Sequence, residues 1–137
     1  MRDQRPIIAI VDDDASVRRG LARLLRSAGY RAETYASALE FLERGLAGKG
    51  PACLMVDVRM PGLSGLDLHE ALVGEGLDVP FIFITGHGDG PMTERAAKLP
   101  KADAVDFLAK PFDDQAMLAA VAQALGRAHR ATRDLAS

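Results

Sequence analysis

The stretch Ile7-Ile8-Ala9-Ile10-Val11-Asp12-Asp13-Asp14 decides the fold, because an uninterrupted apolar run ends abruptly in three acidic residues. A second run, Cys53-Leu54-Met55-Val56, ends in the same way at Asp57. Continuous apolar runs of this length are typical of parallel strands that are buried on both faces. If the two strands are neighbours, their carboxyl ends lie side by side at the edge of the sheet where open α/β folds bind ligands.

Acidic side chains that gather at one edge of a sheet require a positive charge beside them. Two unit charges about 4 Å apart repel each other by roughly 4 kcal/mol at an effective dielectric constant of 20. A cluster of Asp12, Asp13 and Asp57 is therefore not expected to persist without a divalent ion or a lysine. The pattern predicts a metal-dependent site.

Length and composition favour one compact domain with a buried core. The chain has 137 residues, of which 48% are hydrophobic and 26% are charged. A net charge of -2 provides no general attraction to nucleic acid or to an anionic membrane. The lone Cys53 cannot form an internal disulfide, and the segment before Ile7 leads into too few apolar residues for a signal peptide or a membrane span. We therefore expect a protein of the reducing cytoplasm.

Short apolar runs alternate five times with longer amphipathic segments. This rhythm predicts an α/β fold with a doubly wound five-stranded parallel sheet and five helices on both faces. The predicted strands are residues 7–11, 31–35, 53–56, 81–84 and 105–109. Apolar stripes at helical spacing follow the strands: Val17, Leu21, Leu24, Leu25 and Ala28; Leu68, Ala71 and Leu72; and Leu118, Val121, Ala122 and Leu125.

Cap residues mark several helix ends in the sequence. Asp14 and Asp113 are expected to cap the first and last helices. Ser37-Ala38-Leu39-Glu40 has the form of a capping box that opens the second helix, which either Gly45 or Gly48 closes. Gly29 is expected to end the first helix in a left-handed conformation, which glycine adopts readily.

The composition of the five runs also predicts their order in the sheet. The first, third and fourth runs are apolar throughout, as central strands require, whereas the second and fifth alternate polar and apolar residues, as edge strands can. The order 2-1-3-4-5 fits this pattern and places the binding crevice between strands one and three, where the aspartates lie. Flavodoxin-like and CheY-like folds are known to have this strand order, so the predicted order is consistent with a known fold and is not new.

These residues resemble the receiver domains of bacterial two-component response regulators. The residues of the shared motif stand at the C-terminal ends of predicted strands one, three, four and five, in this order: Asp12-Asp13, Asp57, Thr85 and Lys110-Pro111. Residues 57–65 resemble the segment around the phosphorylated aspartate of that family, and residues 85–92 resemble the FixJ-type subgroup. The resemblance covers nearly the whole chain.

The resemblance implies that Asp57 takes a phosphoryl group from a phosphohistidine of a sensor histidine kinase. It further implies Mg2+ (or Mn2+) as the cofactor, bound directly by Asp13, Asp57 and the backbone carbonyl of Arg59, while Asp12 holds a metal-bound water. Lys110 would bring its ammonium group to the phosphoryl oxygens. Such a domain is not an enzyme, because it assists only its own phosphorylation and dephosphorylation.

Two further pairs of residues take roles from the resemblance. Thr85 and Phe107 would switch the output surface, and Arg59 and His87 would tune the lifetime of the phosphoryl group. Phe107 stands where many relatives have tyrosine, and it has no hydroxyl to hold the ring at the surface, so an inward position at rest is open to it. An ordinary core role and a switch role both remain open for Phe107. We also expect a cis peptide bond at Lys110-Pro111.

The region between the fourth helix and the fifth strand departs from the family pattern. The segment from Thr85 to Lys110 looks longer than in close relatives, and Pro100 predicts that the fourth helix ends early. This region belongs to the helix 4, strand 5 and helix 5 surface through which relatives form homodimers on phosphorylation. His69 and His129 are expected to be surface residues.

Residues 1–126 are predicted to form the receiver domain, and residues 127–137 either extend the fifth helix or form a linker tail. The resemblance implies control of transcription through an output domain absent from this chain, so nucleic acid would be bound only by that domain. Two alternatives remain: a stand-alone receiver or scaffold that acts by protein-protein interaction, and a haloacid-dehalogenase-type phosphatase. The second would use Asp12 and Asp14, but Ser16 stands where it expects threonine or valine.

Overall fold

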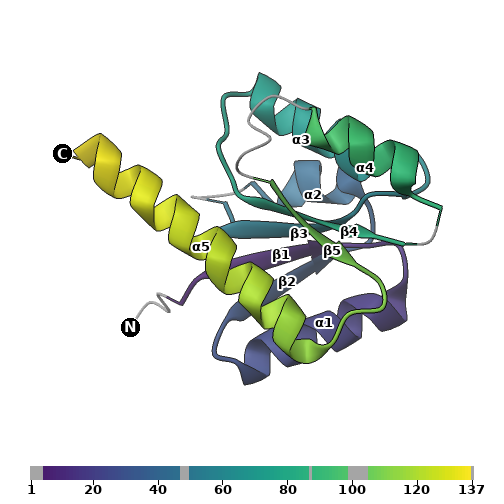
Figure 1. Cartoon of the computed structure of the whole chain (residues 1–137), viewed down its shortest axis with the longest axis horizontal. Coiled ribbons are helices and arrows are strands. Elements are labelled where there is room, and N and C mark those ends of the chain that lie inside the picture. Colours follow the sequence, from purple (N-terminus) through teal and green to yellow (C-terminus); the bar gives the residue numbers. More distant parts are fainter. Residues whose placement is uncertain (1–4, 47–49, 87, 99–104, 137) are drawn as a thin grey trace.

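Five parallel strands form the centre of the molecule (Figure 1). They are β1 (Ile7–Val11), β2 (Arg31–Tyr35), β3 (Cys53–Asp57), β4 (Phe81–Thr85) and β5 (Val105–Ala109), in the spatial order β2-β1-β3-β4-β5. This computed structural model describes residues 5–46, 50–86, 88–98 and 105–136. The predicted strand order is confirmed, and the strand bounds differ from the predicted ones only where β3 and β4 extend to Asp57 and Thr85.

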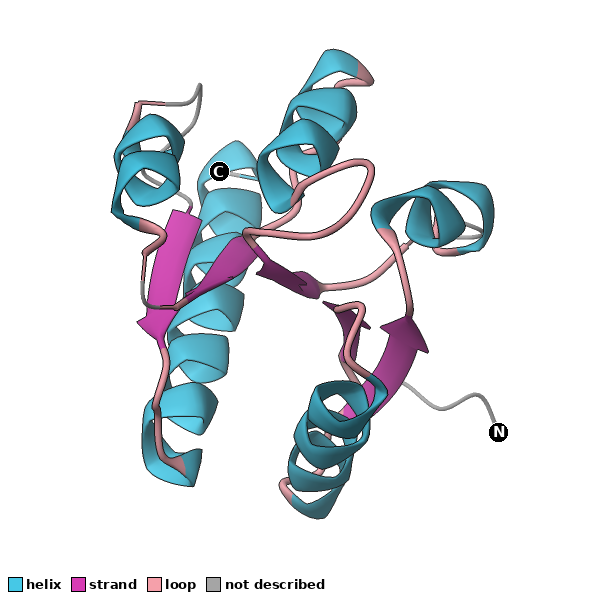
Figure 2. Ribbon diagram, turned by 90° about the vertical axis from the view of Figure 1, so that its right-hand side faces the viewer, coloured by secondary structure: helices cyan, strands magenta, loops and turns pink. Residues whose placement is uncertain are grey.

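Helices cover both faces of the sheet, as the alternation of runs predicted. α1 (Ala15–Ser27) and α5 (Asp114–Ala136) lie on one face, and α2 (Ala38–Arg44), α3 (Gly65–Gly74) and α4 (Gly90–Ala97) lie on the other (Figures 1 and 2). Among the helices in the described residues, none has both the length and the apolar character needed to cross a membrane.

Alternate side chains of the central strands enter two separate hydrophobic clusters. In β1, Ile8 and Ile10 pack with α1 and α5, whereas Ala9 and Val11 pack with α2, α3 and α4. Fully burying a large apolar side chain contributes about 1.5–3 kcal/mol, so a strand with both faces covered is held strongly. β1, β3 and β4 are therefore the fixed centre of the fold.

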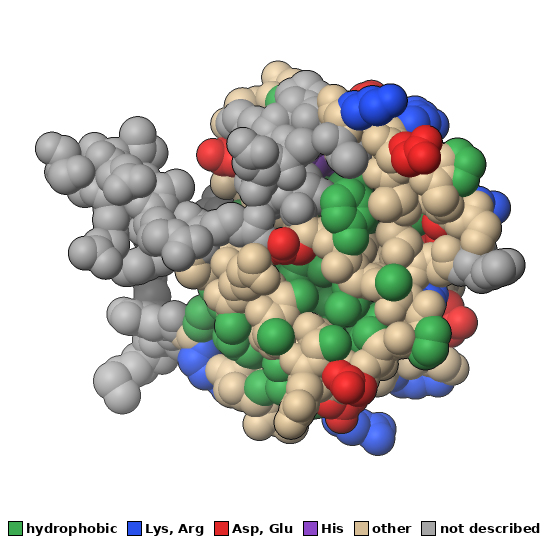
Figure 3. Space-filling model, in the orientation of Figure 1, with side chains coloured by type: hydrophobic (Ala, Val, Ile, Leu, Met, Phe, Trp, Pro, Cys, Tyr) green, Lys and Arg blue, Asp and Glu red, His purple; other side chains and the backbone are tan. Residues whose placement is uncertain are grey.

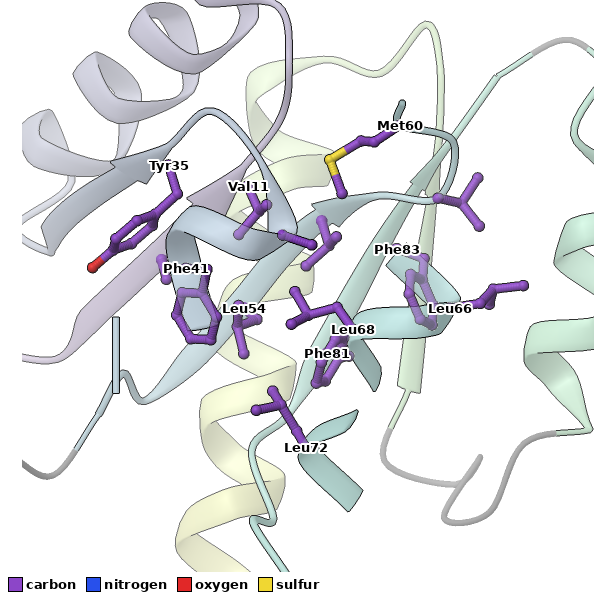
Figure 4. Close-up of a cluster of buried hydrophobic side chains, with 14 of the residues drawn as sticks. Val11, Tyr35, Phe41, Leu54, Met60, Leu66, Leu68, Leu72, Phe81 and Phe83 are labelled. Atoms are coloured by element: carbon purple, nitrogen blue, oxygen red, sulfur yellow. The ribbon is translucent and has the colours of Figure 1, made fainter. Parts of the chain in front are cut away.

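The second of these clusters, between the sheet and α2 to α4, is rich in aromatic rings (Figure 4). Phe81 and Phe83 of β4 lie with their ring centroids 5.6 Å apart. His69 of α3 packs edge-on against Phe81 at 4.8 Å and is only 3% exposed. The prediction that His69 is a surface residue is therefore wrong. Burial lowers the pKa of His69 and favours the neutral ring, which explains how an imidazole fits here.

The predicted N-caps at Asp14, Ser37 and Asp113 are confirmed, whereas the predicted capping box at α2 is only half formed. Asp14 accepts hydrogen bonds from the amides of Ser16 and Val17, and Asp113 accepts one from Ala116 at 2.7 Å. At α2, the hydroxyl of Ser37 accepts from the amide of Glu40, but the Glu40 carboxylate accepts from Ala36, one residue before the position that a strict capping box requires. Gly29 has a φ of 96°, and Gly45 follows α2; Gly48 lies outside the described residues.

Most of the predicted apolar stripe of α5 is confirmed, because Leu118, Val121 and Leu125 lie in or against the core. Val121 is buried as expected, but Met117 and Ala124 are its buried neighbours, while Ala122 is exposed. Spacing alone allows either set, because both recur at helical intervals. The packing of α5 on β4 and β5 selects between them.

The ends of α4 and α5 test two predictions, the early stop of the fourth helix and the boundary between domain and tail. α4 ends at Ala97, which agrees with an early stop before Pro100; residues 99–104, including the segment expected to be irregular, lie outside the described residues. α5 continues to Ala136, so the backbone of the tail is helical. The boundary between residues 126 and 127 stays a prediction, because one helix crosses it.

Gly65, the first residue of α3, lies against the end of β3. A Cβ atom at this position would lie 2.7 Å from the carbonyl oxygen of Asp57 and 3.1 Å from the Cα of Val58. Both are backbone atoms and cannot move aside without shifting the strand. Only glycine at position 65 therefore lets α3 start directly beside Asp57, the last residue of β3.

Substitution of Gly65 tests this close approach. Gly65→Ala should lower the free energy of unfolding by about 1–3 kcal/mol, because the added methyl overpacks against backbone. Gly74→Ala, at the other end of α3 where nothing lies within 4 Å of a built Cβ, should be neutral or stabilise by up to about 1 kcal/mol. Urea unfolding of both variants measures the difference. Equal free energies of unfolding for the two variants would show that the close approach at Gly65 does not exclude a Cβ atom.

Candidate functional site at the carboxyl edge of the sheet

Strand register brings the residues of the predicted motif to one edge of the sheet. Val11 pairs with Val56, so Asp12 and Asp57 both follow directly on paired residues of β1 and β3. At the neighbouring strands, Thr85 pairs with Ala109, and the amide of Lys110 donates to the carbonyl oxygen of Thr85 at 2.8 Å. The peptide bond between Lys110 and Pro111 is cis, as predicted.

Three carboxylates converge at this edge. Asp12, Asp13 and Asp57 each offer one carboxylate oxygen, and these oxygens all lie within 4.8 Å of one another. Asp12 is only 1% exposed, Asp57 is half-buried and Asp13 is exposed. The Nζ of Lys110 lies 3.9 Å from Oδ2 of Asp57. One lysine thus faces a cluster of three negative charges.

Hydrogen bonds fix two of the carboxylates and leave one buried oxygen without a partner. Oδ1 of Asp12 accepts from the amide of Asp14 at 2.9 Å, and Oδ1 of Asp57 accepts from the amide of Arg59 at 2.9 Å. Oδ2 of Asp12 is buried and has no hydrogen-bond partner in the described structure. Since buried polar atoms in folded proteins are nearly always paired, this oxygen can accept a hydrogen bond from a water, including one bound to a metal ion.

Burial is the main influence on the acidity of the cluster. It raises the pKa of the Asp12 carboxyl, an effect opposed by the amide of Asp14 and reinforced by the charge of Asp57. Burial likewise raises the pKa of Asp57, while the amide of Arg59 and the ammonium of Lys110 act in the opposite direction. Both carboxyls are therefore harder to ionise than ordinary aspartates until more positive charge arrives.

The donor set fits a hard divalent cation. All three side chains supply oxygen, the ligand type that Mg2+ and Mn2+ prefer, and Mg2+ typically takes one or two protein carboxylates with water and phosphate completing its shell. The unpaired Oδ2 of Asp12 is available to a water on such an ion. The structure describes no contact of the carbonyl oxygen of Arg59, so its role as a ligand stays a prediction.

The predicted switch residues occupy different environments. Thr85 is 8% exposed at the end of β4. Phe107 of β5 is 38% exposed, with its ring centroid 6.0 Å from that of Phe83. The ring therefore lies at the surface at rest, and Phe107 is not an ordinary core residue. β5 is an edge strand, so a side chain on it is covered on fewer sides than one on β4.

Phe107 is one of the large apolar side chains that are exposed at the surface. Figure 3, in the orientation of Figure 1, shows hydrophobic side chains on the face that carries β5 and the first half of α5. This is the face expected to change on switching. His87, predicted to tune phosphoryl lifetime, lies outside the described residues.

Sequence reasoning missed one residue next to the site. Asp89, before α4, is 6% exposed; its Oδ1 accepts from Nε of Arg59 at 2.8 Å, and its Oδ2 accepts from the amide of Gly86 at 2.7 Å. The only signal in the sequence was an acidic residue within a glycine-rich turn. Arg59 and Asp89 are far apart in the chain, so spacing could not pair them.

Comparison with known proteins decides the family. The model of the response regulator receiver domain matches residues 8–122, which is well over half of the chain. The chain belongs to the response regulator receiver domain family. The crystal structure of FixJ-N superposes with a TM-score of 0.79 and 38% sequence identity, and the match covers 92% of this chain and 96% of that one. The predicted family and fold are confirmed.

Curated relatives of this receiver domain are longer proteins. Nodulation protein W of Bradyrhizobium diazoefficiens is 48% identical over 123 residues, which cover 90% of this chain and 52% of that protein. The transcriptional regulatory protein FixJ of Azorhizobium caulinodans is 46% identical over 120 residues, covering 88% of this chain and 55% of that protein. This receiver domain thus spans about half the length of these relatives.

Replacement of Asp12 by asparagine is expected to stabilise the metal-free receiver domain at neutral pH. Because burial raises the pKa of Asp12, ionisation in the folded state lowers stability as the pH rises through that pKa. Asp12→Asn avoids this loss and should gain about 1 kcal/mol at about pH 7, well below the roughly 4 kcal/mol of unscreened repulsion at about 4 Å. The gain should vanish below the ordinary aspartate pKa of about 3.9.

Added Mg2+ should reverse this order. An ion that binds only the folded protein stabilises it by mass action, and the wild type keeps the complete carboxylate set. Urea unfolding with and without MgCl2 measures both effects, with Glu43→Gln, an exposed carboxylate on α2, as the matched control. A metal-free Asp12→Asn variant that is less stable than the wild type, or equal stabilisation of both by Mg2+, would contradict this picture of the cluster.

Proposed function

We propose that this receiver domain of a two-component system accepts a phosphoryl group on Asp57 from a sensor histidine kinase, with Mg2+ bound beside it. The observation that supports the proposal is the convergence of three carboxylates within 4.8 Å, with Lys110 Nζ 3.9 Å from Asp57. Such a cluster disfavours its own ionised state until a cation binds. A metal-assisted phosphoryl acceptor is a use that fits this arrangement.

In the proposed reaction, a carboxylate oxygen of Asp57 attacks the phosphorus of a phosphohistidine on the kinase. A P–O bond to Asp57 forms while the P–N bond breaks, and the imidazole nitrogen leaves with the electron pair. Attack of water on the phosphorus later returns the Asp57 carboxylate and inorganic phosphate. Burial raises the pKa of Asp57 above the ordinary value of about 3.9, but the ammonium of Lys110 and a bound cation would favour the carboxylate, so Asp57 would need no general base at neutral pH.

Three groups of this chain would act on the transferred phosphoryl group. The amide of Arg59 holds Oδ1 of Asp57 at 2.9 Å and so orients the carboxylate. Lys110 would bring a point charge to the phosphoryl oxygens. The hydroxyl of Thr85, at the end of the next strand, would donate to one of those oxygens.

A divalent ion held by Asp13, Asp57 and the carbonyl of Arg59, and by Asp12 through water, would offset the repulsion between the Asp57 carboxylate and the phosphoryl group. The oxygen-only donor set and the unpaired Oδ2 of Asp12 support this assignment.

The signal would pass through Thr85 to the surface formed by α4, β5 and α5. If the Thr85 hydroxyl moves toward the phosphoryl group, the turn after β4 follows it and leaves space that the half-exposed Phe107 ring can fill. Relatives such as FixJ are named transcriptional regulatory proteins. We therefore extend the proposal to transcription control through an output domain, and to a homodimer on phosphorylation through this surface.

The two alternative functions have less support. A haloacid-dehalogenase-type phosphatase would need Asp14 as a second catalytic carboxylate, but its Oδ1 accepts from the amides of Ser16 and Val17 and caps α1. A scaffold that is never phosphorylated has no use for a buried acidic cluster facing a lysine.

Phosphoryl uptake is the direct test. With acetyl phosphate and Mg2+, intact-mass analysis should show one added phosphoryl group on the wild type and none on Asp57→Asn, which lacks the nucleophilic carboxylate. Asp67→Asn is the matched control and should be phosphorylated like the wild type. Full uptake by Asp57→Asn, or phosphate release that Asp12→Ala abolishes and Asp57→Ala does not, would reject the proposal.

A further inference from the structure

An ion pair joins the loop after β3 to the start of α4. Nε of Arg59 lies 2.8 Å from Oδ1 of Asp89, and Nη2 of Arg59 donates to the carbonyl oxygen of Gly88 at 3.2 Å. The side chain of Arg59 is 63% exposed, whereas that of Asp89 is only 9% exposed. The pair is thus asymmetric: the arginine can reach water, and the aspartate cannot do so without moving.

Asp89 organises the turn between β4 and α4. Its Oδ2 accepts from the amide of Gly86 at 2.7 Å, directly after Thr85. Its backbone carbonyl accepts from both the amide and the hydroxyl of Thr93, each at 2.9 Å, in the first turn of α4. The carboxylate makes no cap bond to α4, so its described partners are Arg59 and Gly86.

Removal of the arginine would therefore affect more than one surface contact. An exposed ion pair contributes little, because water screens it and replaces it. A mostly buried carboxylate that loses its cation is strongly destabilised where it stands. Asp89 would then turn toward solvent, and the amide of Gly86 would lose its acceptor.

Arg59 is also in direct contact with the proposed phosphoryl acceptor. Its amide donates to Oδ1 of Asp57 at 2.9 Å, while its guanidinium binds Asp89. A phosphoryl group carries about -1.5 to -2 charges at neutral pH and binds guanidinium groups strongly. A phosphoryl group on Asp57 would compete with Asp89 for the same guanidinium.

We propose that the Arg59–Asp89 pair is a latch that holds the β4–α4 turn in its resting form until a phosphoryl group on Asp57 draws the guanidinium away. The latch rests on the function proposed above. Its release frees the amide of Gly86 and the start of α4 at the moment when Thr85 is drawn inward. The strength of the Arg59–Asp89 pair thus sets how readily the β4–α4 turn is released.

Hydrogen exchange at the amides of Gly86 and Thr93, which both bond to Asp89, tests the latch. Exchange is measured with and without beryllium fluoride and Mg2+, a stable mimic of a phosphoryl group on a carboxylate. In the wild type the mimic should accelerate exchange of both amides about tenfold. In Arg59→Met exchange should already be fast without the mimic, and the mimic should change it by less than about twofold.

Two further variants sharpen the test. Asp89→Asn keeps an acceptor for the amide of Gly86 but removes the charge that holds Arg59, and should also lose most of the response. Arg44→Met breaks the pair between Arg44 and Glu40 on α2, which are 3.1 Å apart, and as the matched control should respond like the wild type.

The outcomes separate the latch from the phosphoryl acceptor. Equal responses in the wild type and Arg59→Met, or no response in the wild type, overturn the latch while phosphoryl uptake from acetyl phosphate leaves the proposed function standing. Absence of phosphoryl uptake by the wild type overturns the proposed function and the latch with it.

Discussion

Repulsion among Asp12, Asp13 and Asp57 is the constraint on which the rest of the structure depends. Three carboxylate oxygens lie within 4.8 Å, and Lys110 is the one cation paired with them in the described structure. Such a cluster persists because the strands that carry it are buried and held on both faces. The fold thus maintains an arrangement that its own electrostatics oppose, and a cation would relieve it.

The neighbouring elements extend this arrangement outward. Gly65 lets α3 start against the end of β3, and Asp14 caps α1 directly after the acidic pair. On the other side, Arg59 links the end of β3 to the turn before α4 through Asp89. A change of charge at Asp57 would therefore act on Arg59, which contacts Asp89 at the start of α4. This connection is the physical basis for a switch.

Much of this could be predicted from the sequence because it depends on local patterns. Apolar runs fixed the strands and their order, and Ser37 and Asp113 marked helix starts. Contacts between distant segments could not be predicted in this way: the burial of His69 depends on Phe81, and the role of Asp89 depends on Arg59. The exposure of Phe107 follows from its place on an edge strand. Composition predicted that this strand lies at the edge of the sheet, but it did not predict how exposed any single side chain on the strand would be.

Binding of Mn2+ followed by nuclear magnetic resonance tests the central claim most directly, because a paramagnetic ion broadens the signals of nearby nuclei. We expect sub-stoichiometric Mn2+ to broaden first the amides of Asp13, Asp57 and Arg59, and excess Mg2+ to restore them. Broadening centred on another acidic region, or none at these three amides, would contradict a metal site at the carboxyl edge of the sheet.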